Sequence, residues 1–294
     1  MATVIGQSGA WHAIVLGVGR CGHSISSPEE IEPLAARLKE ERQGALDAHR
    51  AATMGLVQER SAQVVELNDT RGFLVRFLNR HKVRRLRYQI AALYADDKAF
   101  GTHLDWVIQR IAGLPGSAEL AGAHAELEVS ERLRLLPDSF VVFNDVHLRA
   151  TRTIRYEGAY LQSAQLDHVV LGPTGVFVIE TKCWSRATAE SDSHHDPFDQ
   201  SARAGYLCFD LLRQAFGTTR VRSVIAHLGS LPAAPRDTKV HAVRPENLRS
   251  FIAEYGYGRE ELSAGQIEQL CPFFERRVVT KVGATARHLA ATVL

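Results

Sequence analysis

The sequence has few cysteines, almost no net charge and no long apolar run, and each shortage argues against a class of protein. Its four cysteines lie far apart and form no CxxC pair, which argues against a zinc ribbon or a disulfide framework. No apolar stretch reaches the length of about 18 residues that a membrane-spanning helix needs. The net charge of +2 is too small to indicate a nucleic-acid binder from composition alone.

The remaining composition is that of an ordinary globular protein. Hydrophobic residues make up 45% and charged residues 23% of the 294 positions, which is close to the average of folded domains. This length allows one large domain or two of ordinary size. The apolar segment 10–19 has no Lys or Arg ahead of it, so the positive region of a secretion signal is missing. We therefore expect a cytoplasmic protein that does not bind a membrane.

Residues 1–28 are predicted to form a glycine-rich extension with some strand character. Gly17 to Gly22 match the spacing of a dinucleotide-binding fingerprint, but that motif needs a helix to begin at the glycines. The residues that follow, His23–Pro28, are poor helix formers. We therefore expect a turn between two short strands.

Residues 29–113 are predicted to form an α-helical, coiled-coil-like domain. Ser27-Pro28 supplies an N-cap and a proline at the first helical position, and apolar residues then recur at helical spacing. Helices are expected at 29–67, 70–93 and 103–111. The domain ends at the cluster Gly113–Gly116. We expect these helices to bind substrate, to form a homo-oligomer or to dock a protein partner.

One part of this helical domain concentrates positive charge. Residues 71–90 contain seven basic residues and no acidic one, so the rest of the chain has a net charge of −5. Four of the basic residues have the spacing of one helix face: Arg76, Arg80, Arg84 and Arg87. This face either contacts nucleic-acid phosphates or is a solvated face paired with acids of the preceding helix.

Residues 114–276 have the element order of an α/β domain. Helices are predicted at 117–136, 198–216, 245–255 and 263–276, and strands at 139–143, 164–171, 176–184, 221–228 and 240–243. This order predicts a mixed sheet flanked by helices. Residues 277–294 form a C-terminal tail, and the sequence contains no internal repeat.

The segment Gln165–Lys182 is predicted to form a β-hairpin around the turn Gly172–Gly175. If the strands pair directly from this turn, Asp167 stands opposite Glu180, with Cβ atoms about 5 Å apart. Because side chains alternate along a strand, Asp167, Glu180 and Lys182 would share one face. A register error of one residue would break this arrangement.

Two opposed carboxylates repel each other unless a cation offsets their charge. Mg²⁺ is commonly held by one or two carboxylates together with water and phosphate oxygens. Asp167 and Glu180 are therefore predicted to bind Mg²⁺, with Mn²⁺ as a substitute, and Lys182 to assist the attacking water. In the alternative interpretation, Lys182 only neutralises the pair on an exposed sheet. The apolar neighbours of the two acids favour the metal site.

Two polar residues on neighbouring helices are expected to point to the same place. Glu126 lies three and seven positions before apolar residues of its helix, so it shares their stripe. Gln200 has the same relation to the apolar stripe of the later helix. Each would also suit a helix-end residue that reaches solvent, but both converge on the hairpin.

These residues resemble the nuclease-related domain family (NERD), which belongs to the PD-(D/E)xK nuclease superfamily. The resemblance covers about residues 119–272 and is carried by Glu126, Gln165–His168, Gly172–Gly175, Val178–Lys182 and Gln200. It implies a restriction-endonuclease-like fold in which Asp167 and Glu180 bind metal. By the same resemblance, Glu126 is the helix carboxylate and a further metal ligand. Lys182 then serves the attacking water, and Gln200 is an auxiliary active-site residue.

The sequence departs from the family pattern at three places. Gly122-Ala123-His124-Ala125-Glu126 replaces the usual Gly-x-x-Gly-Glu, Leu166 stands in the place of the proline, and Cys183 follows the lysine. None of these changes removes a catalytic group, so an intact active site is expected.

The resemblance predicts an enzyme, a Mg²⁺-dependent nuclease that hydrolyses DNA phosphodiester bonds. Bacterial proteins with this domain are linked to DNA processing or to defence against foreign DNA, and RNA stays open as an alternative substrate. A second hypothesis is a non-catalytic nucleic-acid-binding or assembly subunit that keeps the nuclease fold. In that case the long helices would carry the function.

Overall fold

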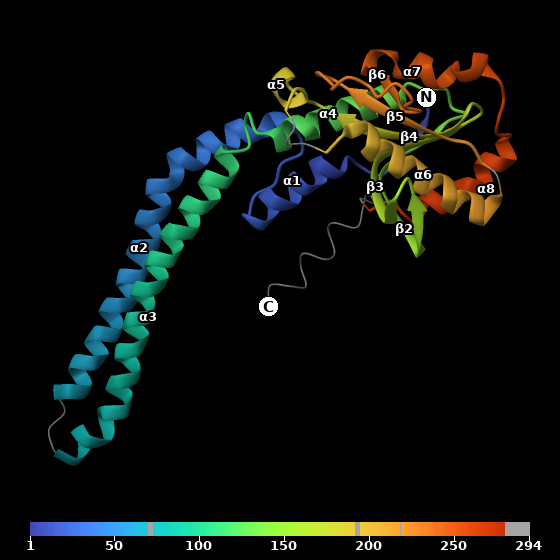
Figure 1. The fold of residues 1–294 in the computed structure, drawn as a ribbon. Coiled ribbons are helices and arrows are strands. Elements are labelled where there is room, and N and C mark those ends of the chain that lie inside the picture. The colour runs from blue at the N-terminus through green and yellow to red at the C-terminus, as the bar shows by residue number, and fades with distance from the viewer. Residues whose placement is uncertain (70–72, 192–194, 218, 280–294) are drawn as a thin grey trace. The chain divides into compact units, whose positions relative to one another are not determined.

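The structure, a computed structural model, describes residues 1–69, 73–191, 195–217 and 219–279 (Figure 1). The chain divides into two compact units. Met1–Gly19 and the chain from Ser117 onward form the first unit, and Arg20–Gly116 forms the second. The first 19 residues, expected as part of a separate extension, thus belong to the unit that contains the sheet.

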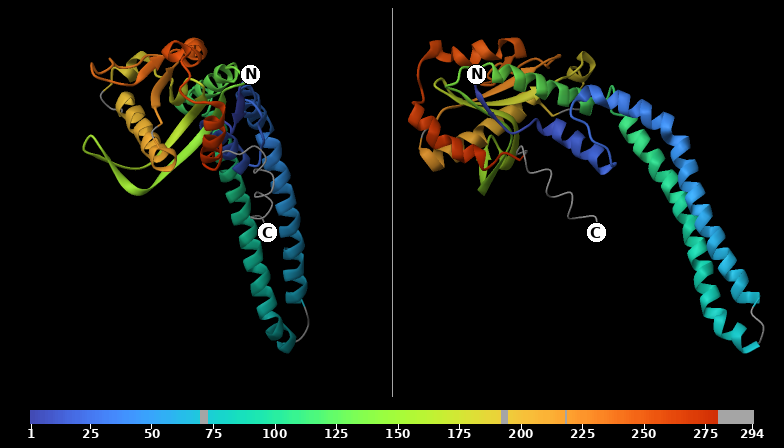
Figure 2. Two further views of the ribbon diagram at one scale, coloured as in Figure 1. Left: turned by 90° about the vertical axis from the view of Figure 1, so that its right-hand side faces the viewer. Right: turned by 180° about the vertical axis from the view of Figure 1, so that it is seen from behind.

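Two long antiparallel helices make up most of the second unit, α2 (Ile31–Asp69) and α3 (Phe73–Ala112). They lie side by side in every view (Figures 1 and 2). Arg42 Nε donates to Asp105 Oδ1 at 2.6 Å, and Arg60 Nη1 donates to Gln89 Oε1 at 3.2 Å. The helices expected separately at 70–93 and 103–111 form one continuous helix, because the residues between them include no proline.

The glycine-rich N-terminal segment differs from the prediction. It forms a short strand, β1 (Thr3–Ile5), and a helix, α1 (Gly9–Arg20), so the expected turn between two strands is wrong. Trp11, Ile14 and Val18 are buried at positions that share one helix face. This apolar spacing outweighs the low helix propensity of the glycines.

Among the described residues, six strands form one mixed sheet in the order β1-β2-β3-β4-β5-β6. The strands after β1 are β2 (Val141–Tyr156), β3 (Ala159–Gly172), β4 (Gly175–Lys182), β5 (Val221–His227) and β6 (His241–Val243). β2, β3 and β4 are antiparallel, β1 runs parallel to β2, and β5 and β6 run parallel to β4. The predicted mixed α/β fold is therefore confirmed, with β2 and β3 longer than expected.

The β3–β4 hairpin has the predicted register around a tighter turn. Gly172 pairs with Gly175, which leaves a two-residue loop, and pairing continues to His168. The pairing ends there, so the predicted pair Asp167–Glu180 is not part of the described ladder. Gly175 has a φ of 119°, a conformation that favours glycine.

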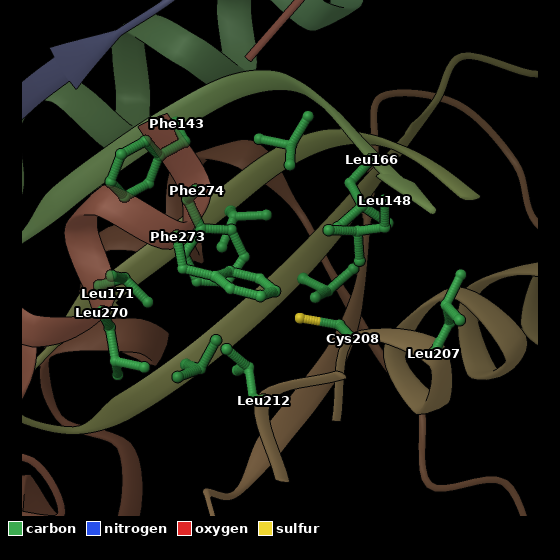
Figure 3. Packing of buried hydrophobic residues seen from close by; sticks show 14 of the residues in the cluster. Phe143, Leu148, Leu166, Leu171, Leu207, Cys208, Leu212, Leu270, Phe273 and Phe274 are labelled. Carbon is green, nitrogen blue, oxygen red and sulfur yellow. The ribbon is translucent and has the colours of Figure 1, made fainter. Parts of the chain in front are cut away.

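Helices cover both faces of the sheet. Besides α1, the described α-helices of this unit are α4 (Ala118–Arg134), α5 (Arg186–Ala189), α6 (Pro197–Phe216), α7 (Pro245–Ala253) and α8 (Ala264–Glu275). One core joins the sheet to α4 and α7, through residues such as Val129 and Leu248. The other joins the sheet to α6 and α8, with Leu171, Cys208 and Phe274 in its interior (Figure 3). No helix in the described part of the chain has the length and apolarity needed to cross a membrane.

Candidate active site

Glu180, Lys182 and Gln200 contact one another where β4 ends beside α6. Lys182 Nζ donates to Glu180 Oε1 at 2.6 Å, and Gln200 Nε2 donates to the same oxygen at 2.9 Å. Lys182 Nζ also donates to Gln200 Oε1 at 3.2 Å. Glu180 is only 7% exposed, so its charge is largely removed from water and depends on these donors. The three residues therefore form a closed polar ring.

Asp167 lies where β3 and β4 stop pairing. Its Oδ2 accepts the backbone N–H of Thr181 at 2.7 Å, so the carboxylate replaces the next backbone acceptor of the ladder. Burial raises the pKa of Asp167 well above its usual range, and the charges of Glu180 and Glu126 raise it further. A bound cation would favour the ionised form of such a carboxyl group.

Glu126 lies on α4 and is partly buried. Burial raises its pKa, as do the charges of Asp145 and Glu180, while hydrogen bonds from Ser8 and Ala10 act in the opposite direction. The electrostatic interactions among Glu126, Asp167 and Glu180 show that all three carboxylates belong to one neighbourhood. Hydrogen bonds thus join Glu180, Lys182 and Gln200. Glu126 and Asp167 are related to this group through the charge of Glu180. The roles predicted for the five residues stay predictions.

Asp145 is a further acidic residue near the site that the sequence analysis missed. It is 2% exposed, has a φ of 52° and accepts a hydrogen bond from Gln165 Nε2 at 2.8 Å. The strand expected at 139–143 ends two positions before Asp145, whereas β2 continues to Tyr156. A polar Asn144-Asp145 pair inside an apolar run was the signal that could have found it.

β2 and β3 are both distorted beside the site. Their ladder skips Asp145 and Asp167, although the register before and after is the same. Leu166 and Val169 belong to one core, whereas strict alternation would put residues three positions apart on opposite faces. The side-chain alternation assumed from the sequence therefore fails here. At this break the Asp167 carboxylate contacts the backbone of β4 instead of following a regular pleat.

The donor chemistry of the site suits a hard divalent cation. Within the described ranges, no group of three or more His, Cys, Asp or Glu side chains is arranged to hold a metal ion. Mg²⁺, however, usually takes only one or two protein carboxylates and completes its shell with water and phosphate oxygens. Asp167 and Glu180 supply ligands of this kind.

The basic residues predicted to bind nucleic acid lie on α3, in the second unit. Arg80, Arg84 and Arg87 are exposed, whereas the side chain of Arg76 lies outside the described residues. The guanidinium of Arg84 lies 5.6 Å from the ring centre of Tyr88. The described ion pairs between α2 and α3 join bases of α2 to acids of α3. Pairing with acids of α2, one of the two interpretations, is not seen for Arg84 or Arg87 in this part of the structure.

Residues 121–228 match the family model of the nuclease-related domain. The matched range contains the hairpin, the α4 carboxylate and the Gln200 position. The match lies within the unit that contains the sheet and agrees with the resemblance seen in the sequence. Membership of the PD-(D/E)xK superfamily is consistent with this family.

Among solved structures, the chain is similar to protein VC1899 from Vibrio cholerae, with 11% sequence identity and a TM-score of 0.26. The alignment covers 86% of this chain and 58% of that chain, so the present sequence spans little more than half of that protein. No curated protein matches the chain.

Proposed function

We propose that this protein is a metal-dependent nuclease that hydrolyses phosphodiester bonds of DNA. The observation that carries the proposal is the Glu180–Lys182–Gln200 ring beside Asp167. It combines the buried carboxyl group of Glu180, the partly buried one of Asp167 and a fixed positive charge, within the range that matches the nuclease-related domain. A salt bridge that served only stability would not need Asp167 at the same point.

Asp167 and Glu180 would hold Mg²⁺, with Mn²⁺ as a substitute. The charge of Glu126, which acts on Asp167, would add to the negative potential that favours the ion. When bound, such an ion lowers the pKa of a water molecule and neutralises charge on the phosphate. Burial is the main cause of the raised pKa of Asp167, and the charges of Glu180 and Glu126 raise it further. These neighbouring negative charges support the assignment, because a cation would offset them.

Lys182 presents a positive charge at a fixed place. Glu180 and Gln200 both accept hydrogen bonds from its Nζ, so the ammonium group needs little reorganisation during reaction. From this position it can donate a hydrogen bond to the attacking water or to the oxygen on which negative charge develops. Gln200 orients the pair, since it contacts both partners.

The exposed arginines of α3 would contact DNA phosphates. Such contacts add affinity without selecting a sequence, because every nucleotide carries the same phosphate. The proposed active site thus belongs to the first unit, and the proposed DNA-binding surface of α3 belongs to the second. It also fits the interpretation of α3 as a substrate-binding element.

Cleavage assays test the proposal. Linear, circular and single-stranded DNA are incubated with Mg²⁺, Mn²⁺ or EDTA, using wild type, Lys182→Ala and Lys39→Ala, an exposed lysine of α2. We expect divalent-dependent cleavage that falls at least about 100-fold in Lys182→Ala, the size of losing one charge-stabilising donor. Lys39→Ala is expected to cleave like wild type.

The contrary result is equally specific. Absence of cleavage by the folded wild type with every substrate and ion would refute the nuclease proposal. If such a protein still bound DNA, the non-catalytic binding subunit would become the better hypothesis.

A further inference from the structure

The first turn of α1 contacts the Glu126 carboxylate. Ser8, the residue before α1, is 2% exposed, and its Oγ accepts the N–H of Trp11 at 3.1 Å. The same hydroxyl donates to Glu126 Oε2 at 2.8 Å, and the N–H of Ala10 donates to that oxygen at 3.2 Å. A serine hydroxyl has a single proton, and Ser8 places it on Glu126.

The backbone of the same turn also approaches Asp145. A Cβ added to Gly9 would lie 2.8 Å from Asp145 Oδ1 and 3.3 Å from Gln165 Nε2. Any larger residue at position 9 would therefore have to displace α1 or the Asp145 side chain. Hydrogen bonds to Glu126 and a close backbone approach to Asp145 thus place this turn against two carboxylates.

Helix geometry gives these contacts an electrostatic direction. The Glu126 carboxylate accepts hydrogen bonds at the amino end of α1, a helix of 12 residues. The unpaired N–H groups at that end carry partial positive charge. Two donors on one oxygen restrict rotation of the carboxylate and favour its ionised form. Residues 8–10 lie outside the range 121–228 that matches the family model, so the family match does not assign them a role.

We infer that Ser8 is a positioning residue of the proposed nuclease, which holds the Glu126 carboxylate in place for the metal and the substrate. This inference rests on the proposed function. Ser8 acts through Glu126 and does not itself touch substrate. Its loss should therefore alter turnover and metal affinity while leaving DNA affinity unchanged.

The first experiment compares two helix caps. Ser8→Ala removes the donor to Glu126, whereas Ser117→Ala removes the cap of α4, whose Oγ accepts the N–H of Leu120. We expect Ser8→Ala to lower kcat about tenfold with unchanged KM, which corresponds to about 1.4 kcal/mol. Mn²⁺ affinity, measured by electron paramagnetic resonance, should fall in parallel. Ser117→Ala should retain both values.

A double-mutant cycle tests whether the effect passes through Glu126. In a Glu126→Gln background, Ser8→Ala should produce little further loss of turnover or Mn²⁺ affinity. Gly9→Ala should reproduce the Ser8→Ala defect. Gly17→Ala, on the same helix with no atom near its added Cβ, should behave like wild type.

Each outcome decides between the two hypotheses. If wild type cleaves DNA but Ser8→Ala matches Ser117→Ala in kcat and Mn²⁺ affinity, the positioning role is wrong while the nuclease proposal stands. Additive losses in the Glu126→Gln background would also refute it. If wild type binds Mn²⁺ without cleaving, a loss of Mn²⁺ affinity in Ser8→Ala but not in Ser117→Ala would support the contact of Ser8 with Glu126 as a positioning contact. Equal Mn²⁺ affinity in the two variants would refute it. If wild type neither cleaves nor binds Mn²⁺, both hypotheses are refuted.

Discussion

Two cysteines show how burial sets the chemistry of single side chains in this protein. Cys208 is fully buried in the core between the sheet and α6, and burial raises its pKa to about 12. Cys183, which follows Lys182 at the end of β4, is exposed. The same residue type is therefore protected at one position and accessible at the other.

The buried thiol predicts a loss of stability at high pH. Above about pH 9 the cysteine of the unfolded chain ionises, while Cys208 in the native state stays protonated up to about pH 12. The unfolded state then binds fewer protons, so the free energy of unfolding falls as pH rises, by up to about 1.4 kcal/mol per pH unit from this group. Urea unfolding between about pH 8 and about pH 10.5 measures this slope.

Two variants separate Cys208 from the other groups that titrate in this range. Cys208→Ala should show a smaller slope than wild type, whatever its stability at neutral pH. Cys183→Ala should keep the wild-type slope, because Cys183 is exposed and is not part of the buried core. Equal slopes in wild type and Cys208→Ala would contradict the prediction.

At the residue scale, the sequence is sufficient to find the side chains that depend on local geometry. The hairpin register extends to His168–Ile179, which leaves Asp167 and Glu180 adjacent to its end. Helical spacing suggested Glu126 and Gln200, and Gln200 contacts Glu180 as expected. Ser8 could not be found this way, because its contact with Glu126 joins positions 118 apart. Asp145 was hidden for a different reason, since it lies at a strand distortion that alternation does not describe.

At the scale of elements, α6 lies close against β5 through one glycine. A Cβ at Gly205 would overlap Ser223 Oγ and would lie 3.3 Å from Ser223 Cβ. This close approach lets α6 place Gln200 beside Glu180. The fit between the two elements therefore supports the candidate site as well as the core.

Gly205→Ala should destabilise the protein by about 1–3 kcal/mol through overpacking, in spite of the better helix propensity of alanine. Adding Ser223→Ala should restore most of the loss, because it removes the overlapping oxygen. Gly122→Ala on α4, where no atom lies near the added Cβ, should be neutral or stabilising. Chemical denaturation of wild type and the three variants measures these values. If Ser223→Ala gave no rescue, the proposed overlap would not be the cause.

Elements were predictable where caps and periodicity agree. The capping box at Ser263 and the apolar stripe of α6 both mark their helices correctly. α1 was not predicted because Gly17 and Gly19 have low helix propensity. The helical spacing of its buried residues Trp11, Ile14 and Val18 outweighs that propensity in the structure. β2 and β3 were predicted too short, because their outer halves are exposed and lack an apolar run.

At the scale of the whole molecule, the candidate active site and the basic surface of α3 belong to different units. The candidate site lies in the unit with the sheet, and the exposed arginines lie on α3 in the helical unit. The proposed function therefore predicts that DNA binding and DNA cleavage respond to different substitutions.

Arg84→Glu/Arg87→Glu should weaken DNA binding at least tenfold at low salt and reduce the salt slope of log K by about two, because two phosphate contacts are lost. Arg37→Glu/Lys39→Glu makes the same charge change at exposed positions of α2 and should have a much smaller effect. Fluorescence anisotropy across a salt series measures both quantities. Equal effects of the two double variants would show that net charge, and not this face of α3, governs binding.

Ser8 leaves the ribosome 118 residues before the glutamate that it contacts, and the entire helical unit is synthesised between them. At about 5–20 residues per second, translation of that interval takes roughly 6–24 s. Helix formation takes about a microsecond, and contacts between neighbouring helices are of low contact order. The α2–α3 hairpin is thus expected to fold before β2, the strand that pairs with β1, has been synthesised. The candidate catalytic centre would then be one of the last features of the nascent protein to assemble.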